Sequence, residues 1–137
     1  MSALTDNRIT QSRDMGRVFR ALMTVSKTIY SGSLVMAVAA GTSEAAAASA
    51  SNKGIAGVAT EKKVSPASGA TWIKLQEGIF LFGCTSVAQT AVLGVVYAQD
   101  DQTVDETQGA NEPRAGYMTE FVSATSGWIA VGIGNHV

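Results

Sequence analysis

The sequence holds one cysteine, one histidine and two prolines among 137 residues. A lone cysteine excludes an intrachain disulfide, and we expect Cys84 to be a small buried apolar side chain. His136 is next to the last residue, which disfavours it as a catalytic base and disfavours a distant pairing with Cys84. Cys and His also lack metal-ligand spacing, and no Gly-rich loop runs into a Lys-bearing helix. The sequence therefore predicts no enzyme, no metal site and no cofactor.

Charge is also scarce, at 15% of residues against 46% hydrophobic residues. A chain so poor in charge must cover apolar surface somewhere, and a subunit contact is the simplest place. No apolar run approaches the ~18 residues of a membrane span, and the charged N-terminus has no apolar block that would predict a secretory signal. A net charge of −1 and a pI near 5.7 lack the basic stripe of a nucleic-acid-binding protein. We expect neither a membrane nor nucleic acid as a partner.

The few charges are unevenly divided. Residues 1–75 carry nine Lys or Arg against four Asp or Glu, whereas residues 76–137 carry Arg114 alone against seven acidic residues. One interpretation is two solvated faces that differ by chance. The other is head-to-tail complementarity, in which a basic part meets an acidic face of a neighbour. Both interpretations stay open at this point.

The C-terminal third has the clearest strand pattern. Residues 94–133 alternate short β-forming runs with turns, the first turn at Asp100 and Asp101 and the last at Ser126 and Gly127. Short strands at close, regular spacing predict an all-β sandwich or barrel of a single domain.

Within this region the pattern G-x-V-Y-A-x-D-D-x-T-V is followed by a glycine-led strand and then by S-G-W-I-A-V-x-I. This order resembles the small head decoration, or capsid cement, proteins of tailed bacteriophages. The resemblance extends from about Gly32 to Ile133 and includes the segment GIAGVATEKKVSPASGATWIKLQEGIFLFG. It implies a β-tulip-like barrel and a homotrimer on the outer surface of the capsid, made in the host cytoplasm. Its implied partner is the major capsid protein.

The N-terminal part is less regular. Residues 1–17 are polar, without a strand pattern, and predict an extended arm ahead of a β-domain at 18–137. Residues 18–30 fit either a helix or a strand, and their β-branched residues favour the strand. Residues 33–41 predict a strand buried on both faces. The alanines of 42–51 suit a short helix, but the resemblance implies an extended segment, which we predict.

A turn at 52–54 and the strand IAGVATEKKV are expected next, followed by two strands, 71–75 and 78–83, around Gln76 and Glu77. In the first strand, alternation places Ile73 and Leu75 opposite Trp72. In the second, both faces are apolar, so it is either central or covered by another subunit.

The last strand alternates in the same way, with Ile129, Val131 and Ile133 opposite Trp128. Each outward tryptophan either covers the rim of the core under a loop or lies in a protein contact. The carboxylates Asp100, Asp101, Asp105 and Glu106 could serve a calcium ion, but the EF-hand spacing is absent. A turn with a solvated acidic loop is therefore the better interpretation.

These observations predict an all-β fold, a compact barrel or sandwich behind an N-terminal arm. The arm is expected to dock along a neighbouring subunit or the shell through its arginines. A structural role as a capsid decoration protein, by resemblance, is favoured over a small β-barrel module for a carbohydrate or other ligand, and an enzyme is least favoured. The residues expected to contact the capsid or another subunit are Arg8, Arg13, Arg17, Trp72, Phe80, Phe82 and Trp128.

Overall fold

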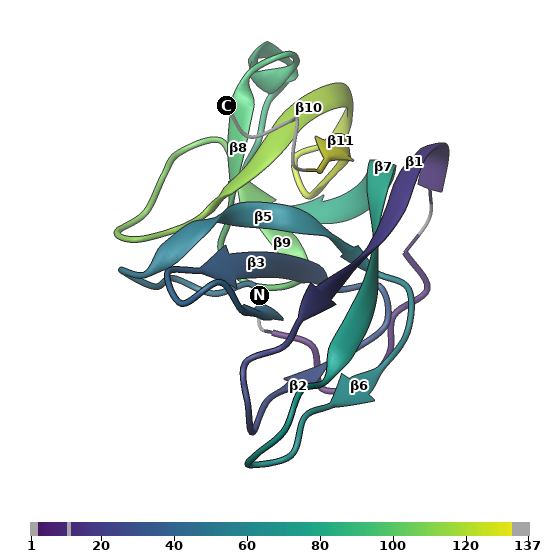
Figure 1. Cartoon of the computed structure of the whole chain (residues 1–137). Helices are drawn as coiled ribbons and strands as arrows, with labels where there is room; N and C mark the ends of the chain where they lie inside the picture. Colours follow the sequence, from purple (N-terminus) through teal and green to yellow (C-terminus); the bar gives the residue numbers. More distant parts are fainter. Residues whose placement is uncertain (1–2, 11, 133–137) are drawn as a thin grey trace.

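The computed structural model describes residues 3–10 and 12–132, and for residues 12–15 it describes the backbone alone. The described chain is all-β, which confirms the expected fold class. Eleven strands and one 3₁₀ turn follow one another within this part of the chain (Figure 1). The first six strands are β1 (Ser12–Leu22), β2 (Thr28–Ile29), β3 (Leu34–Val38), β4 (Ser43–Ala45), β5 (Asn52–Ala59) and β6 (Lys63–Val64). The others are β7 (Trp72–Cys84), η1 (Gln89–Ala91), β8 (Val95–Ala98), β9 (Thr103–Asp105), β10 (Arg114–Ser123) and β11 (Ser126–Val131).

Five strands close into a barrel in the order β7, β9, β8, β10, β11 and back to β7. The closing contact is antiparallel and pairs Gly78–Gly83 of β7 with Ser126–Val131 of β11. The β7–β9 pair is the parallel one in this ring. The β8–β9 hairpin turns at the predicted acidic pair, where the Asp100 carboxylate accepts a hydrogen bond from the backbone N–H of Gln102 at 2.9 Å. Closure leaves none of these five strands with a long open edge.

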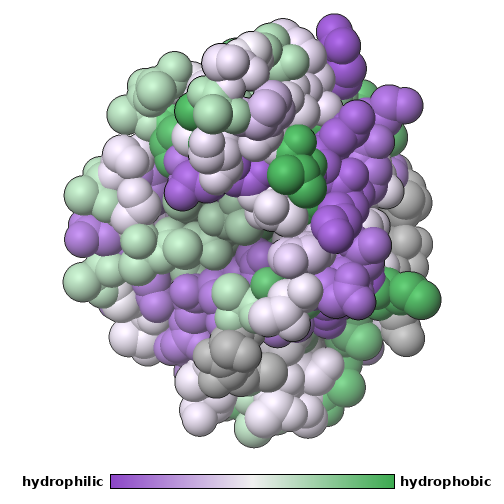
Figure 2. Space-filling view, turned by 90° about the horizontal axis from the view of Figure 1, so that it is seen from below, coloured by the Kyte–Doolittle hydropathy of each residue, from purple (hydrophilic) through white to green (hydrophobic). Residues whose placement is uncertain are grey.

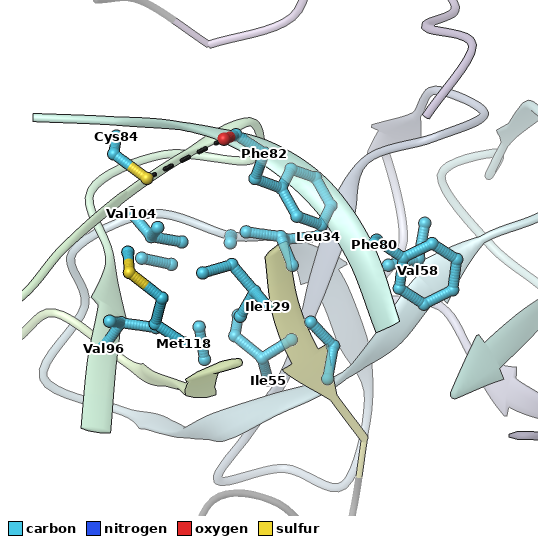
Figure 3. Packing of buried hydrophobic residues seen from close by; sticks show 14 of the residues in the cluster. Leu34, Ile55, Val58, Phe80, Phe82, Cys84, Val96, Val104, Met118 and Ile129 are labelled. Carbon is cyan, nitrogen blue, oxygen red and sulfur yellow. Dashed lines mark hydrogen bonds between the residues drawn. The ribbon is translucent and has the colours of Figure 1, made fainter. Parts of the chain in front are cut away.

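Strands β5, β3 and β4 continue the sheet from β7 and pack across the barrel (Figure 1). Their inward residues Leu34, Ile55 and Val58 join one apolar cluster with Phe82 and Ile129 of the barrel (Figure 3). The strand expected to be buried on both faces is β3, and all its side chains except that of Ala37 are buried. The main core therefore lies between the barrel wall and the β3–β5 layer.

A second, smaller apolar cluster lies under the paired strands β1 and β7, which together we call the ribbon. Ile73 and Leu75 of β7 are fully buried in it, as the alternation predicted, with Met23 and Ile29 from the first third of the chain. Phe19 and Ala21 of β1, opposite Leu75 and Ile73, pack against this cluster from the same inner side of the ribbon. The short β2–β6 sheet lies beyond it, at the bottom of Figure 1.

The predicted division into two strands around Gln76 and Glu77 is wrong, because β7 runs unbroken from Trp72 to Cys84. The two polar side chains at the expected division are bonded to β1. Gln76 Nε2 donates to the carbonyl of Gly16 at 3.1 Å, and Arg17 forms an ion pair with Glu77 at 3.0 Å. Polar residues can therefore stand in the middle of this strand because the neighbouring strand satisfies them.

Other local predictions have mixed outcomes. Strand β1 confirms the extended choice for the start of 18–30, and β4 confirms it for residues 43–45 of the segment 42–51, which contains no helix. The expected turn at 52–54 is wrong, since these residues begin β5. Asp101 is also not part of a solvated loop: it is 2% exposed, and its Oδ1 accepts the N–H of Leu4 at 2.8 Å.

The N-terminal arm differs from its prediction in two ways. Residues 12–17 belong to β1, so the expected boundary at residue 17 falls inside a strand. Residues 3–10 then lie on the chain's own domain, where the N–H of Arg8 donates to the carbonyl of Ser31 at 2.8 Å. Gly32 has a φ of +87°, and a Cβ there would lie 2.2 Å from the carbonyl oxygen of Arg8. The arm therefore packs closely against the domain of its own chain, directly over Gly32.

Candidate interaction surface

The outer side of the ribbon carries the most prominent exposed apolar and basic side chains together. In the register of β1 and β7, Arg20 lies opposite Lys74 and Leu22 opposite Trp72. Residues opposite one another in an antiparallel pair project to the same side, so these four share one face with Val18. This set, Val18, Arg20, Leu22, Trp72 and Lys74, is called the ribbon face below.

Trp72 is the centre of the ribbon face. Its side chain is 43% exposed because Ile73 and Leu75 occupy the inner side of the strand. The guanidinium carbon of Arg20 lies 4.9 Å from the centroid of the Trp72 ring, a cation–π contact worth about 0.5–1 kcal/mol at exposed sites. Val18, 57% exposed, extends the apolar part along β1. The pair thus presents an oriented aromatic ring with a cation held against it.

Two shallow hollows flank this centre. One, of about 470 Å³, is lined by Arg20, Lys63, Trp72 and Lys74 together with Glu61, whose carboxylate accepts the backbone N–H of Lys74 at 3.1 Å. The other, of about 380 Å³, is lined almost wholly by apolar atoms of residues that include Leu22, Met23, Val25, Ala40 and Ala70. Ala70 lines both hollows, so a basic and an apolar depression lie side by side.

Figure 2 views the molecule from the end where β2 and β6 lie. A continuous band of hydrophilic residues runs along one side of this end, and weakly hydrophobic residues gather on the opposite side. The surface here is therefore mixed rather than uniformly charged, which is typical of non-obligate protein contacts.

The residues predicted to make contacts do not form one surface. Trp72 is on the ribbon face, whereas Trp128 is half-buried on β11, opposite Leu81 of β7. Leu81 follows Trp72 by nine positions along β7, roughly 30 Å of extended strand. Phe80 and Phe82, also predicted as contact residues, are 4% and 0% exposed and belong to the main core, so neither lies on the ribbon face (Figure 3).

The three arginines expected to dock the arm also lie apart. Arg8 is half-buried against the chain's own domain. Arg17 is exposed and pairs with Glu77. The backbone of Arg13 is in β1, and its side chain lies outside the described residues, as does His136. The side chains of Arg8 and Arg17 therefore do not form one docking surface, and Arg8 in particular is held by its own domain.

Sequence reasoning missed four of the five members of the ribbon face, Val18, Arg20, Leu22 and Lys74. Val18 and Arg20 alternate with Phe19 and Ala21, which is a strand signal, but the same stretch also fitted a helix. Once the pairing of β1 with β7 is known, the alternation of both strands brings these residues to one face.

The remaining candidates for chemistry are placed as follows. Cys84 is buried as expected, donates to the carbonyl of Phe82 at 3.7 Å, and has its pKa raised to about 11, mainly by burial. In the acidic loop, Asp105 accepts the N–H of Thr107 and Glu112 accepts that of Gly109. Within the described ranges no group of three or more His, Cys, Asp or Glu side chains is arranged to hold a metal ion. The same ranges contain no helix of the length and apolar character that crossing a membrane requires.

The fold and this surface place the chain among small all-β barrels that carry an exposed aromatic and basic face. No family model matches the sequence, and no curated protein or solved structure matches it significantly. The functional argument consequently depends on the chain's own residues and on the sequence resemblance described above.

Proposed function

We propose that the chain is a structural virion protein that binds the outer surface of a tailed-phage capsid and stabilises the shell by bridging major capsid protein subunits. The resemblance of residues 32–133 to head decoration proteins motivates this proposal. The Trp72–Arg20 pair is the observation that supports the ribbon face as the surface in contact with the capsid. Tryptophan and arginine are the side chains most enriched at energetic centres of protein contacts.

The mechanism is association. A ligand that binds only the assembled shell stabilises that state by mass action, more strongly as its concentration rises above its Kd. Burying Trp72 and Val18 against a shell subunit supplies the apolar contribution, at about 25 cal/mol per Å² of area removed from water. Arg20 and Lys74 would meet carboxylates at the rim, where charges steer the approach more than they add affinity.

Co-sedimentation with purified, expanded, undecorated heads tests the proposal. The wild-type chain is expected to sediment with the heads, and Trp72→Ala to bind at least about tenfold more weakly, about 1.4 kcal/mol. Val122→Ala is the matched control, because Val122 is 51% exposed on β10, outside the ribbon. A wild-type chain that stays in the supernatant would refute capsid binding. Equal binding of wild type and Trp72→Ala would refute the ribbon face as the contact.

We also propose that the protein associates as a homotrimer, at least on the shell or at high concentration. The low charge of the sequence and its exposed apolar side chains support self-association. Light scattering of the free protein over a concentration series, together with subunit counting on decorated heads, measures the assembly state. A strict monomer under both conditions would contradict the trimer.

A second candidate function is a small binding module for a carbohydrate. It is favoured by the exposure of Trp72 beside an open hollow with polar lining, whereas Tyr97 and Trp128 are only partly accessible. Titration of tryptophan fluorescence with a panel of oligosaccharides distinguishes the two functions. Saturable quenching that Trp72→Ala removes, without binding to heads, would establish the module; its absence alongside co-sedimentation would establish the decoration protein.

A further inference from the structure

Arg8 carries a half-buried guanidinium whose contacts among the described residues are with neutral groups. Its Nη1 donates to Thr10 Oγ1 at 2.7 Å, and its Nη2 donates to the carbonyl of Leu81 at 3.3 Å. Its guanidinium carbon lies 5.0 Å from the centroid of the Phe82 ring. Burial lowers the pKa of Arg8. No carboxylate forms an ion pair with it in the part of the chain that the structure describes.

Hydrogen bonds hold both the backbone and the side chain of Arg8. Its backbone N–H is bonded to Ser31, and Thr10 Oγ1, which accepts from the side chain, itself donates to the carbonyl of Gly32 at 2.6 Å. The guanidinium is therefore preorganised, and little conformational entropy remains to be lost when a further group binds it.

A hollow of about 290 Å³ lies beside this residue. We call it the arm pocket; its lining includes Arg8, Thr10, Val58, Ala59, Gln76 and Phe80. Thus both partners of the Arg8–Thr10 hydrogen bond line a hollow that also has an apolar wall. Ile9 belongs to the same lining, and its side chain is 97% exposed.

The chemistry of this pocket defines its ligand. The planar guanidinium, with five N–H donors, matches the geometry of a carboxylate. Two of the five donors are engaged by the contacts described, which leaves donors for a carboxylate oxygen. Val58, Phe80 and the exposed Ile9 would contact the apolar groups beside that carboxylate. The lining thus combines an apolar wall with polar side chains, of which the Arg8 guanidinium is the charged one, and a few oriented polar groups beside apolar surface are typical of ligand sites.

We propose that the arm pocket binds an acidic side chain, flanked by apolar residues, of a partner polypeptide. Charge complementarity at Arg8 does not depend on whether the chain binds capsids. The arm pocket borders the ribbon face at Gln76, which is opposite Val18, but shares no residue with it, so the two proposals can fail independently.

Amide chemical-shift titrations of the full chain test the proposal. The probes are an acetylated, amidated Val-Glu-Val peptide and its Val-Gln-Val counterpart, which differs only by the charge. The Glu peptide is expected to shift the amides of Gly32, Thr60 and Gln76, and the Gln peptide to bind at least about tenfold more weakly. A third titration uses butyrate. If butyrate binds as tightly as the Glu peptide, the pocket accepts free small carboxylates, and this result would overturn the proposed polypeptide ligand.

Two variants sharpen the result. Arg8→Gln should abolish binding of the Glu peptide, and Arg20→Gln, which removes an exposed arginine of the ribbon face, should not change it. Because Arg8→Gln can also release the arm, Thr60→Glu provides a second readout at an exposed position in the pocket lining. Its carboxylate should occupy the site intramolecularly, raise Tm and block the peptide. Equal shifts from both peptides, no shifts from either, or unaltered peptide binding by Thr60→Glu would overturn the proposal.

Discussion

The barrel and the ribbon share strand β7 but use it in opposite ways. In the barrel, Phe80, Phe82 and Cys84 of β7 are buried, and β11 and β9 pair with its backbone. In the ribbon, Trp72 of the same strand is exposed to solvent. Within the described chain, the neighbouring strand β1 pairs with β7 alone and leaves its other edge unpaired. One end of the strand is therefore committed to stability, and the other end remains available for contacts.

The largest difference is expected from matched truncations at the two ends of β7. Phe82→Ala removes a fully buried ring from the main core and should lower the free energy of unfolding by about 3–5 kcal/mol. Trp72→Ala removes a larger but exposed side chain and should cost about 1 kcal/mol or less. Urea denaturation of both variants measures the contrast, and equal losses would show that the ribbon end is as tightly packed as the barrel.

The next effect concerns the arm, which bridges the two regions. Gly32→Ala would place a Cβ 2.2 Å from the Arg8 carbonyl at a φ of +87° and should cost about 1–3 kcal/mol. Gly41→Ala is the control, because Gly41 has a nearly equal φ of +84° but no atom within 4 Å of the added Cβ. If the arm causes the difference, deleting residues 1–10 should itself lower stability and make the two substitutions equivalent. A deletion that leaves Tm unchanged would contradict this.

A smaller effect is expected from Asp101, which holds the arm at Leu4. Burial raises the pKa of the Asp101 carboxyl above its unfolded value, roughly pH 4. The folded state then binds the proton more tightly, so this group's stabilising contribution is complete below the unfolded pKa and is lost as pH rises through the folded pKa. Asp101→Asn keeps an oxygen acceptor without the buried charge. Relative to wild type, it should gain stability between acid and neutral pH, because it carries no carboxylate whose ionisation burial disfavours.

Thermal unfolding of both proteins over a pH series measures this gain. A wild-type minus variant difference that is flat with pH would show that Asp101 titrates as an ordinary carboxyl.

The smallest effect is expected on the ribbon face itself. Val18→Thr exchanges a methyl for a hydroxyl at a position that is 57% exposed and should alter stability by less than about 0.5 kcal/mol. The same exchange at the fully buried Val96 of β8 should cost about 1–3 kcal/mol, because the hydroxyl loses its hydration. Parallel denaturation curves compare them. A costly Val18→Thr would indicate that Val18 already packs against another copy.

Much of the fold could be predicted from the sequence, because alternation alone gives the inner side of a strand with one apolar face. Ile73 and Leu75, or Ile129 and Val131, are examples. Phe80 and Phe82 were misplaced because both faces of their segment are apolar, and only the curvature of the closed barrel selects the inner one. A charged residue such as Glu77 suggested that the strand is interrupted, because the Arg17 that pairs with it is distant in sequence and the ion pair cannot be seen there. The candidate site was found at Trp72 alone, since the pairing of β1 with β7 brings in its other members.

The position of β7 in the chain also has a consequence for how the protein reaches its native state. This strand bonds to β1, near the start of the chain, and to β11, near its end. Neither the ribbon nor the barrel can be completed by local contacts. The entropy cost of closing large loops must therefore be met before the strand contacts that compensate for it can form. Proteins with such non-local topology fold in milliseconds to seconds rather than microseconds. During synthesis β1 leaves the ribosome before its partner β7. Its inner side therefore stays uncovered until β7 has left the ribosome as well.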